Sequence, residues 1–109
     1  MITKKKRLIF EKQAVIAKSI AHPLRIAILD FLRQGPQCVC DIADHLDAEH
    51  SNVSRHLAVL VNSGVLEYEK QGLKVIYSLK APCILDFFDC MTRCLKQQFK
   101  DQQQLLKAL

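Results

Sequence analysis

The stretch from Asp44 to Gly64 constrains the fold of this chain more than any other, because it carries two helical patterns around a short turn. Its first residues end a short predicted helix, residues 46–49 predict a turn, and the rest predicts a second helix of about four turns. The second helix has one apolar stripe at helical spacing, made of Val53, Leu57, Leu60 and Val61. Two helices joined by so short a turn are typical of a helix-turn-helix.

The other side of this second helix suits contact with DNA. Its side chains are small, polar or cationic, and they belong to Ser51, Asn52, Ser54 and Arg55. In the major groove Asn pairs bidentately with adenine and Arg with guanine, while Ser contacts bases or phosphate. An ordinary amphipathic helix with a solvated face has the same pattern. This segment alone therefore leaves both interpretations open.

A predicted β-hairpin follows directly and favours the DNA-binding interpretation. Residues 65–70 and 73–79 alternate partly between apolar and polar side chains, and Gln71-Gly72 supplies a turn between them. A helix-turn-helix followed by such a hairpin is a winged helix. The predicted tip carries Lys70, Gln71 and Lys74, which can reach phosphates or the minor groove. A plain hairpin that closes the core is the alternative.

Three more helices complete the prediction. One runs from Leu8 to Ile20, a second from Pro23 to Leu32, and the last from Pro82 to about Ala108. The fold class is mainly α with a small β-hairpin, in the order α-α-α-α-β-β-α, as a single winged helix-turn-helix domain over residues 1–109. The last helix has more apolar surface than so short a chain can cover, so we expect it to form a two-fold dimer interface with the first helix. The alternative is that it folds back on its own domain.

Composition limits the remaining function classes. The formal charge of +5 favours an anionic partner, though only weakly. No apolar run approaches the roughly 18 residues of a membrane span and no signal peptide is evident, so we expect a cytoplasmic protein without a membrane partner. The sequence offers no nucleophile–base pair, glycine-rich phosphate loop or paired carboxylates, which argues against an enzyme. The five cysteines are an odd number and are expected to be free thiols.

Several segments together resemble a known family. They are HPLRIAIL at 22–29, CVCDIADHL at 38–46, SNVSRHLAVL at 51–60, the hairpin and the long last helix. With them the chain resembles the ArsR/SmtB family of metal-sensing repressors over essentially its whole length. The resemblance implies a homodimer that binds double-stranded operator DNA when empty and releases it when an inducer binds. It also implies that the DNA-facing residues are Ser51, Asn52, Ser54, Arg55 and His56.

Cys38 and Cys40 resemble the CVCD box with which many members of that family bind arsenite, antimonite, cadmium or lead. Thiolates are the ligands that soft ions select. Residues two apart on a regular helix point about 200° apart, so both sulfurs reach one ion only if the first turn unwinds or shifts. Ligation would then disturb the DNA-binding unit. The alternative is that both cysteines act as small hydrophobic residues.

The CVCD pair lacks the third ligand of either family pattern. Ala43 stands where the arsenite pattern has a cysteine, and no cysteine precedes Cys38 as the cadmium/lead pattern requires. The last helix offers Cys90 and Cys94, one helical turn apart, whereas Cys83 lies about 10 Å further along the axis. Three roles are open for Cys90 and Cys94. They form a separate thiol site, or one of them completes the Cys38/Cys40 site within or across subunits, or both are packing residues at an interface.

The histidines carry less information. No histidine follows His56, so the zinc or nickel site that the resemblance implies on the last helix is expected to be absent. His45 and His50 are expected to face solvent.

We therefore predict a repressor with no constitutive cofactor. Its inducer is As(III) or Sb(III) as the first choice and Cd(II) or Pb(II) next, with Cys38, Cys40, Cys90 and Cys94 as candidate ligands. The alternative is a redox- or persulfide-responsive repressor on the same fold, in which cysteines link through sulfur. A DNA-binding module without an effector is a further possibility.

Overall fold

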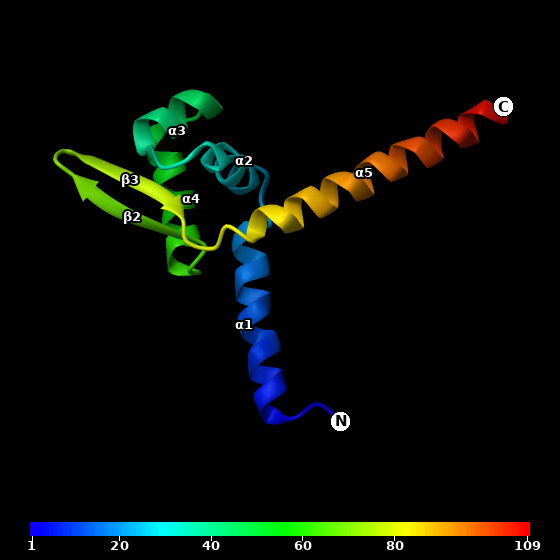
Figure 1. Cartoon of the computed structure of the whole chain (residues 1–109), viewed down its shortest axis with the longest axis horizontal. Coiled ribbons are helices and arrows are strands. Elements are labelled where there is room, and N and C mark those ends of the chain that lie inside the picture. The colour runs from blue at the N-terminus through cyan, green and yellow to red at the C-terminus, as the bar shows by residue number, and fades with distance from the viewer.

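Five α-helices and a small three-stranded sheet make up the structure, a computed structural model that describes residues 1–109. Helices α2, α3 and α4 and the sheet form one body, from which α1 and α5 project in different directions (Figure 1). The elements in chain order are α1 (Lys4–Ile20), α2 (Pro23–Phe31), the 3-10 helix η1 (Leu32–Gln34), β1 (Gln37–Cys38), α3 (Val39–Leu46), α4 (His50–Asn62), β2 (Leu66–Gln71), β3 (Lys74–Leu79) and α5 (Ile84–Lys107).

Local capping explains where the predicted helices begin and end. Thr3 accepts a hydrogen bond from the backbone N–H of Lys6 at 3.1 Å, so α1 starts before the apolar pattern does. His22 caps α2 in the same way, with Pro23 in its first turn. Gly64 adopts a positive φ of 85°, which lets the chain turn back after α4.

The sheet has the order β1-β3-β2 and contains one strand that the sequence did not predict. The spacing argument for the CVCD box treats Cys38 and Cys40 as residues of one regular helix, but the backbone of Cys38 is extended, with φ −80° and ψ 161°. Strand β1 pairs antiparallel with β3, with Gln37 opposite Tyr77 and Cys38 opposite Ile76. A two-residue strand shows no periodicity of its own, so only its pairing with β3 reveals it.

The hairpin is confirmed, with its turn one residue further on than predicted. Gln71 belongs to β2 and pairs with Lys74, so the two-residue connection is Gly72-Leu73. Gly72 has a φ of 64°, a conformation that glycine adopts without a steric penalty and that two-residue hairpins favour. Leu73 is fully exposed at the tip.

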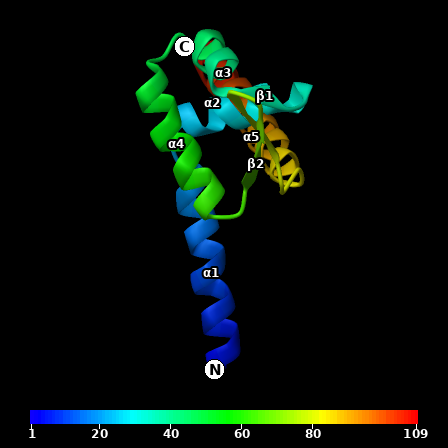
Figure 2. The ribbon, with the colours of Figure 1, turned by 90° about the vertical axis from the view of Figure 1, so that its left-hand side faces the viewer.

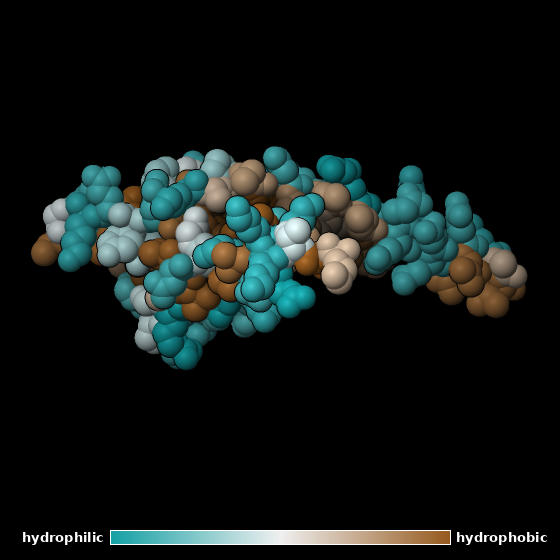
Figure 3. Space-filling view, turned by 90° about the horizontal axis from the view of Figure 1, so that it is seen from below, coloured by the Kyte–Doolittle hydropathy of each residue, from teal (hydrophilic) through white to brown (hydrophobic).

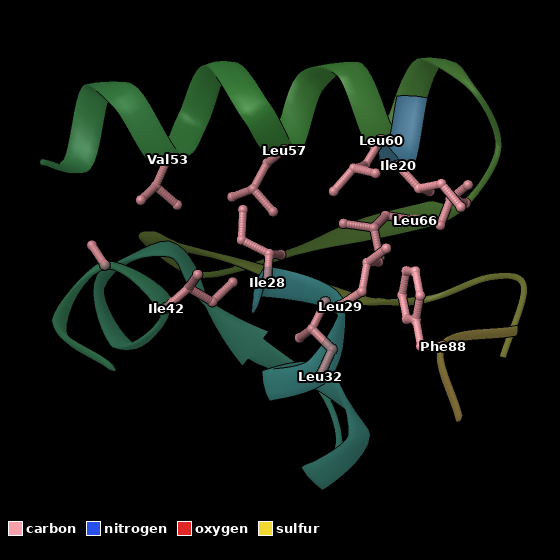
Figure 4. Packing of buried hydrophobic residues seen from close by; sticks show 12 residues of the cluster. Ile20, Ile28, Leu29, Leu32, Ile42, Val53, Leu57, Leu60, Leu66 and Phe88 are labelled. Carbon is pink, nitrogen blue, oxygen red and sulfur yellow. The ribbon is translucent and has the colours of Figure 1, made fainter. Parts of the chain in front are cut away.

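The core lies beneath α4 (Figure 4). Val53, Leu57 and Leu60 are fully buried and point from one side of α4 toward the rest of the core. The same core contains residues from the other elements, namely Ile20 of α1, Ile28 and Leu29 of α2, Leu32 of η1, Ile42 of α3, Leu66 of β2 and Phe88 of α5. This packing confirms the apolar stripe and leaves the opposite side of α4 at the surface.

Both terminal helices carry apolar side chains that the chain does not cover. Phe88 is the only buried residue of α5. Further along α5, Leu95, Phe99 and Leu106 are more than half exposed, as are Leu8, Ile9 and Val15 on α1. The possibility that α5 folds back on its own domain is therefore not what the structure shows (Figure 1). None of the helices combines the length and apolar character that a membrane crossing requires.

Candidate nucleic-acid interface and thiol sites

The polar side of α4 offers the residues expected for reading DNA. Ser51 and Arg55 are exposed and Asn52 and Ser54 are half-buried. Nη2 of Arg55 donates a hydrogen bond to Oδ1 of Asn52 at 2.8 Å. The contact holds the guanidinium and amide groups side by side on the helix surface. These are the two side chains with the strongest base preferences in the major groove.

The β2–β3 hairpin lies beside α4 (Figure 2), on the side of the body turned away from α5. Its predicted contact residues Lys70, Gln71 and Lys74 are all exposed. Gln71 and Lys74 are opposite each other in the register, so they share one face of the hairpin, and Lys70 points to the other face. The arrangement allows the tip to contact a phosphate backbone from either face.

His56 has a packing role that the sequence did not reveal. Nε of Arg25 on α2 donates a hydrogen bond to its Nδ1 at 3.0 Å, and the ring of His22 packs against it at 4.5 Å between centroids, tilted by 41°. Burial lowers the pKa of His56 below its usual value, and the positive charges of His22, Arg25 and Arg55 lower it further. The ring is therefore neutral and half-buried, which leaves Ser51 and Arg55 as the more accessible residues of the DNA-facing set.

The two cysteines of the CVCD box lie in different environments. Cys38 ends β1 and precedes the first residue of α3, and its side chain is buried at 6% exposure. Cys40 is exposed in the first turn of α3. The prediction that both belong to one regular helix is wrong, because pairing with β3 holds Cys38 in an extended conformation.

Cys40 contacts α4, which we call the recognition helix because its polar side is expected to read DNA. Its Sγ lies 3.7 Å from Nε2 of His50, the first residue of α4. His50 is exposed as expected, but it is not free of other side chains. His45 is also exposed and stacks on Phe31 at 4.0 Å between ring centroids. The Cys40–His50 contact spans ten residues of chain, so no local pattern in the sequence predicts it.

The α5 cysteines stay apart from the CVCD box within one chain. Cys83 directly precedes α5, and Cys83, Cys90 and Cys94 are exposed free thiols. The structure holds no group of three or more His, Cys, Asp or Glu side chains that is arranged to bind a metal ion. An α5 thiol therefore reaches Cys38 or Cys40 only from another subunit or after a rearrangement.

Comparison with known proteins decides the family. The HTH-type transcriptional regulator Rv0081 of Mycobacterium tuberculosis (strain ATCC 25618 / H37Rv) is 30% identical over 102 residues, which cover 93% of this chain and 90% of that protein. The family described as "Bacterial regulatory protein, arsR family" matches residues 22–68. The chain belongs to the ArsR family. Its members are DNA-binding transcriptional regulators, and the chain is one of these and not an enzyme.

Two further comparisons are informative. An arsenical resistance operon repressor of Staphylococcus xylosus is 31% identical over 70 residues, which cover 64% of this chain and 67% of that protein. The solution structure of Mb0332 from Mycobacterium bovis, a homodimeric winged helix-turn-helix DNA-binding domain, superposes with a TM-score of 0.80 at 22% identity, over 92% of this chain and 93% of that one. The superposition confirms the predicted winged helix-turn-helix fold.

Proposed function

We propose that this ArsR-family chain is a homodimeric repressor that releases operator DNA when a soft ion binds the thiolates of Cys38 and Cys40. Arsenite and antimonite are the first choice of inducer, and cadmium and lead are the next. The observation that carries the proposal is the place of the CVCD box, at the junction where β1 ends and α3 begins. The similarity to an arsenical resistance repressor supports the choice of ion.

The junction connects the thiols to both DNA-binding elements. Through Cys38, β1 pairs with Ile76 of the wing strand β3, while Cys40 lies in the first helix of the helix-turn-helix. Because the Cys38 side chain is buried, an ion that ligates both sulfurs has to move Cys38 out of its present position. That movement disturbs the β1–β3 pairing and the start of α3 together. Ion binding is thus coupled to the relative position of recognition helix and wing.

The exposed apolar faces of α1 and α5 support a dimer. Apolar surface lies along the projecting α5 and again at its C-terminal end (Figure 3), where Leu105, Leu106 and Leu109 are each more than 60% exposed. Burying such faces against a second copy removes them from water, at about 25 cal/mol for each Å² of apolar surface. A two-fold dimer also presents two recognition helices to two half-sites of an operator.

The proposal is tested by measuring operator-fragment binding with the reduced protein. The complex is titrated with arsenite, antimonite, cadmium, lead and zinc. We expect at least one soft ion to release the DNA, and both Cys38→Ser and Cys40→Ser to abolish release while DNA affinity without ion is retained. Release that survives both substitutions would contradict the proposal. Single Ser variants of Cys90 and Cys94 then show whether α5 contributes a ligand.

The same assay separates the redox- or persulfide-responsive alternative. An ion sensor responds under fully reducing conditions, because thiolates bind the ion without losing electrons to an oxidant. A redox sensor responds only when peroxide or polysulfide is added, and its response is reversed by a thiol reductant. Release by peroxide or polysulfide with no response to any ion would replace the proposed inducer class with the alternative.

A further inference from the structure

The contact between Cys40 and His50 joins the two helices of the helix-turn-helix through two metal-ligating side chains. Cys40 lies in the first turn of α3 and His50 is the first residue of α4. Both are exposed, so an ion reaches them from solvent without any movement of the core. Their Sγ and Nε2 atoms are 3.7 Å apart.

That separation fits two ligands of one tetrahedral ion. Zinc binds thiolate sulfur at about 2.3 Å and imidazole nitrogen at about 2.0–2.1 Å, and a tetrahedral angle then places the two donor atoms about 3.6 Å apart. The observed 3.7 Å therefore needs almost no adjustment of either side chain. A ligating imidazole binds the ion in its neutral form, through a ring nitrogen that carries no proton.

The donor set and the local charge indicate which ions fit. A thiolate with an imidazole suits borderline divalent cations, whereas arsenite takes thiolates. The segment from residue 41 to residue 49 carries four carboxylates and no Lys or Arg, which favours a cation at this position. We propose that Cys40 and His50 are two ligands of a site for a divalent cation of the zinc and cadmium class. Water or Cys38 fills the remaining positions.

Such an ion would link the first turn of α3 to the first residue of the recognition helix, because each helix supplies one ligand. His50 directly precedes Ser51 and Asn52, which are expected to face DNA. An ion on His50 fixes the imidazole against α3 and adds positive charge at this end of α4. The effect on DNA release rests on the proposed function, but ion binding by Cys40 and His50 does not. The two are therefore tested by separate measurements.

Ion binding is measured on the reduced full-length protein without DNA, with Co²⁺ as a spectroscopic probe and Zn²⁺ and Cd²⁺ as competitors. We expect a thiolate-to-cobalt charge-transfer band for the unaltered protein. Cys40→Ser should abolish the band, and His50→Gln should weaken Co²⁺ and Zn²⁺ binding by at least about tenfold. His45→Gln is the matched control, because His45 is exposed on α3 but stacks on Phe31. A Cys38→Ser variant shows whether Cys38 occupies a third position.

Two results would overturn the inference. One is the absence of Co²⁺ and Zn²⁺ binding by the unaltered protein. The other is Co²⁺ affinity in His50→Gln equal to that in His45→Gln, which would mean that the 3.7 Å contact is only a thiol–imidazole hydrogen bond. Neither result affects arsenite-induced DNA release through Cys38 and Cys40, so the proposed function stands or fails on its own assay.

Discussion

Nε of Arg25 donates a hydrogen bond to Nδ1 of His56 at 3.0 Å, and this contact joins the buried helix α2 to the recognition helix α4. The other end of the guanidinium donates to the backbone carbonyl of Ser19 at 3.1 Å. Arg25 thereby connects α1, α2 and α4. It also fixes the protonation state of His56, because a nitrogen that accepts a hydrogen bond carries no proton.

The His56 contact predicts a pH dependence of stability. The pKa of His56 lies below its usual 6.5, chiefly because burial disfavours the charged ring. As the pH falls through that usual value, the unfolded chain takes up a proton that the folded chain does not, so the free energy of unfolding decreases. We expect His56→Gln to reduce the decrease in the free energy of unfolding between about pH 7 and pH 5.5. The measurement is chemical denaturation at several pH values. His45→Gln should keep the decrease, and an unchanged slope in His56→Gln would contradict the assignment.

The recognition helix predicts a specific loss on substitution of Arg55. The Arg55 guanidinium lies on the exposed face of α4, beside Asn52. Loss of a bidentate base contact should cost about 1–3 kcal/mol of operator binding and relax the base preference at one position. The measurement is competition between operator and scrambled DNA for Arg55→Ala. An equal loss on both DNAs would show that Arg55 contacts only phosphate.

The wing predicts a different, sequence-independent effect. Lys70 and Lys74 are exposed at the hairpin tip, where a phosphate contact releases counterions. Each change to Gln should weaken binding to operator and scrambled DNA alike. It should also reduce the salt slope, which is the slope of the logarithm of the binding constant against the logarithm of the salt concentration, by about one. Lys107→Gln, at the far end of α5, is the control (Figure 1). If the salt slope stays unchanged in both wing variants, the hairpin tip does not contact the DNA phosphates.

The core predicts a contrast between two identical substitutions. Leu57 is fully buried under α4, whereas Leu73 is fully exposed at the hairpin turn. Leu57→Ala should lower the free energy of unfolding by about 2–5 kcal/mol, because it leaves a cavity. Leu73→Ala should change it by less than about 0.5 kcal/mol. Denaturation is measured at one protein concentration, since association adds to the stability. Similar values for both variants would contradict the packing.

The dimer predicts sensitivity to charge on one side of α5. Leu95 and Phe99 lie on its exposed apolar stripe. Leu95→Glu with Phe99→Glu should shift the protein toward monomer in sedimentation experiments, because buried charges without partners oppose association. Gln97→Glu is the control, since residue 97 lies about 200° around the helix from residue 95. A dimer that resists both glutamates would place the interface elsewhere.

Much of the fold was predictable because its signals are local. The stripe of Val53, Leu57 and Leu60 fixed which side of α4 is buried, and Pro23 and Gly64 marked helix boundaries. Helical periodicity, capping and turn chemistry involve neighbours within about four residues, so a sequence carries them directly. The polar face of α4 followed from the same periodicity.

The thiol site depended on tertiary structure. The sequence showed that Cys38 and Cys40 are two residues apart, but pairing of β1 with β3 decided that one is buried and extended and the other exposed and helical. From the sequence we expected His50 to face solvent, and the family resemblance placed His56 among the DNA-facing residues. Packing of α3 and α2 against α4 brought the first to Cys40 and the second to Arg25. Such contacts join residues ten or more positions apart, so only the fold, which determines how the elements pack, brings them together.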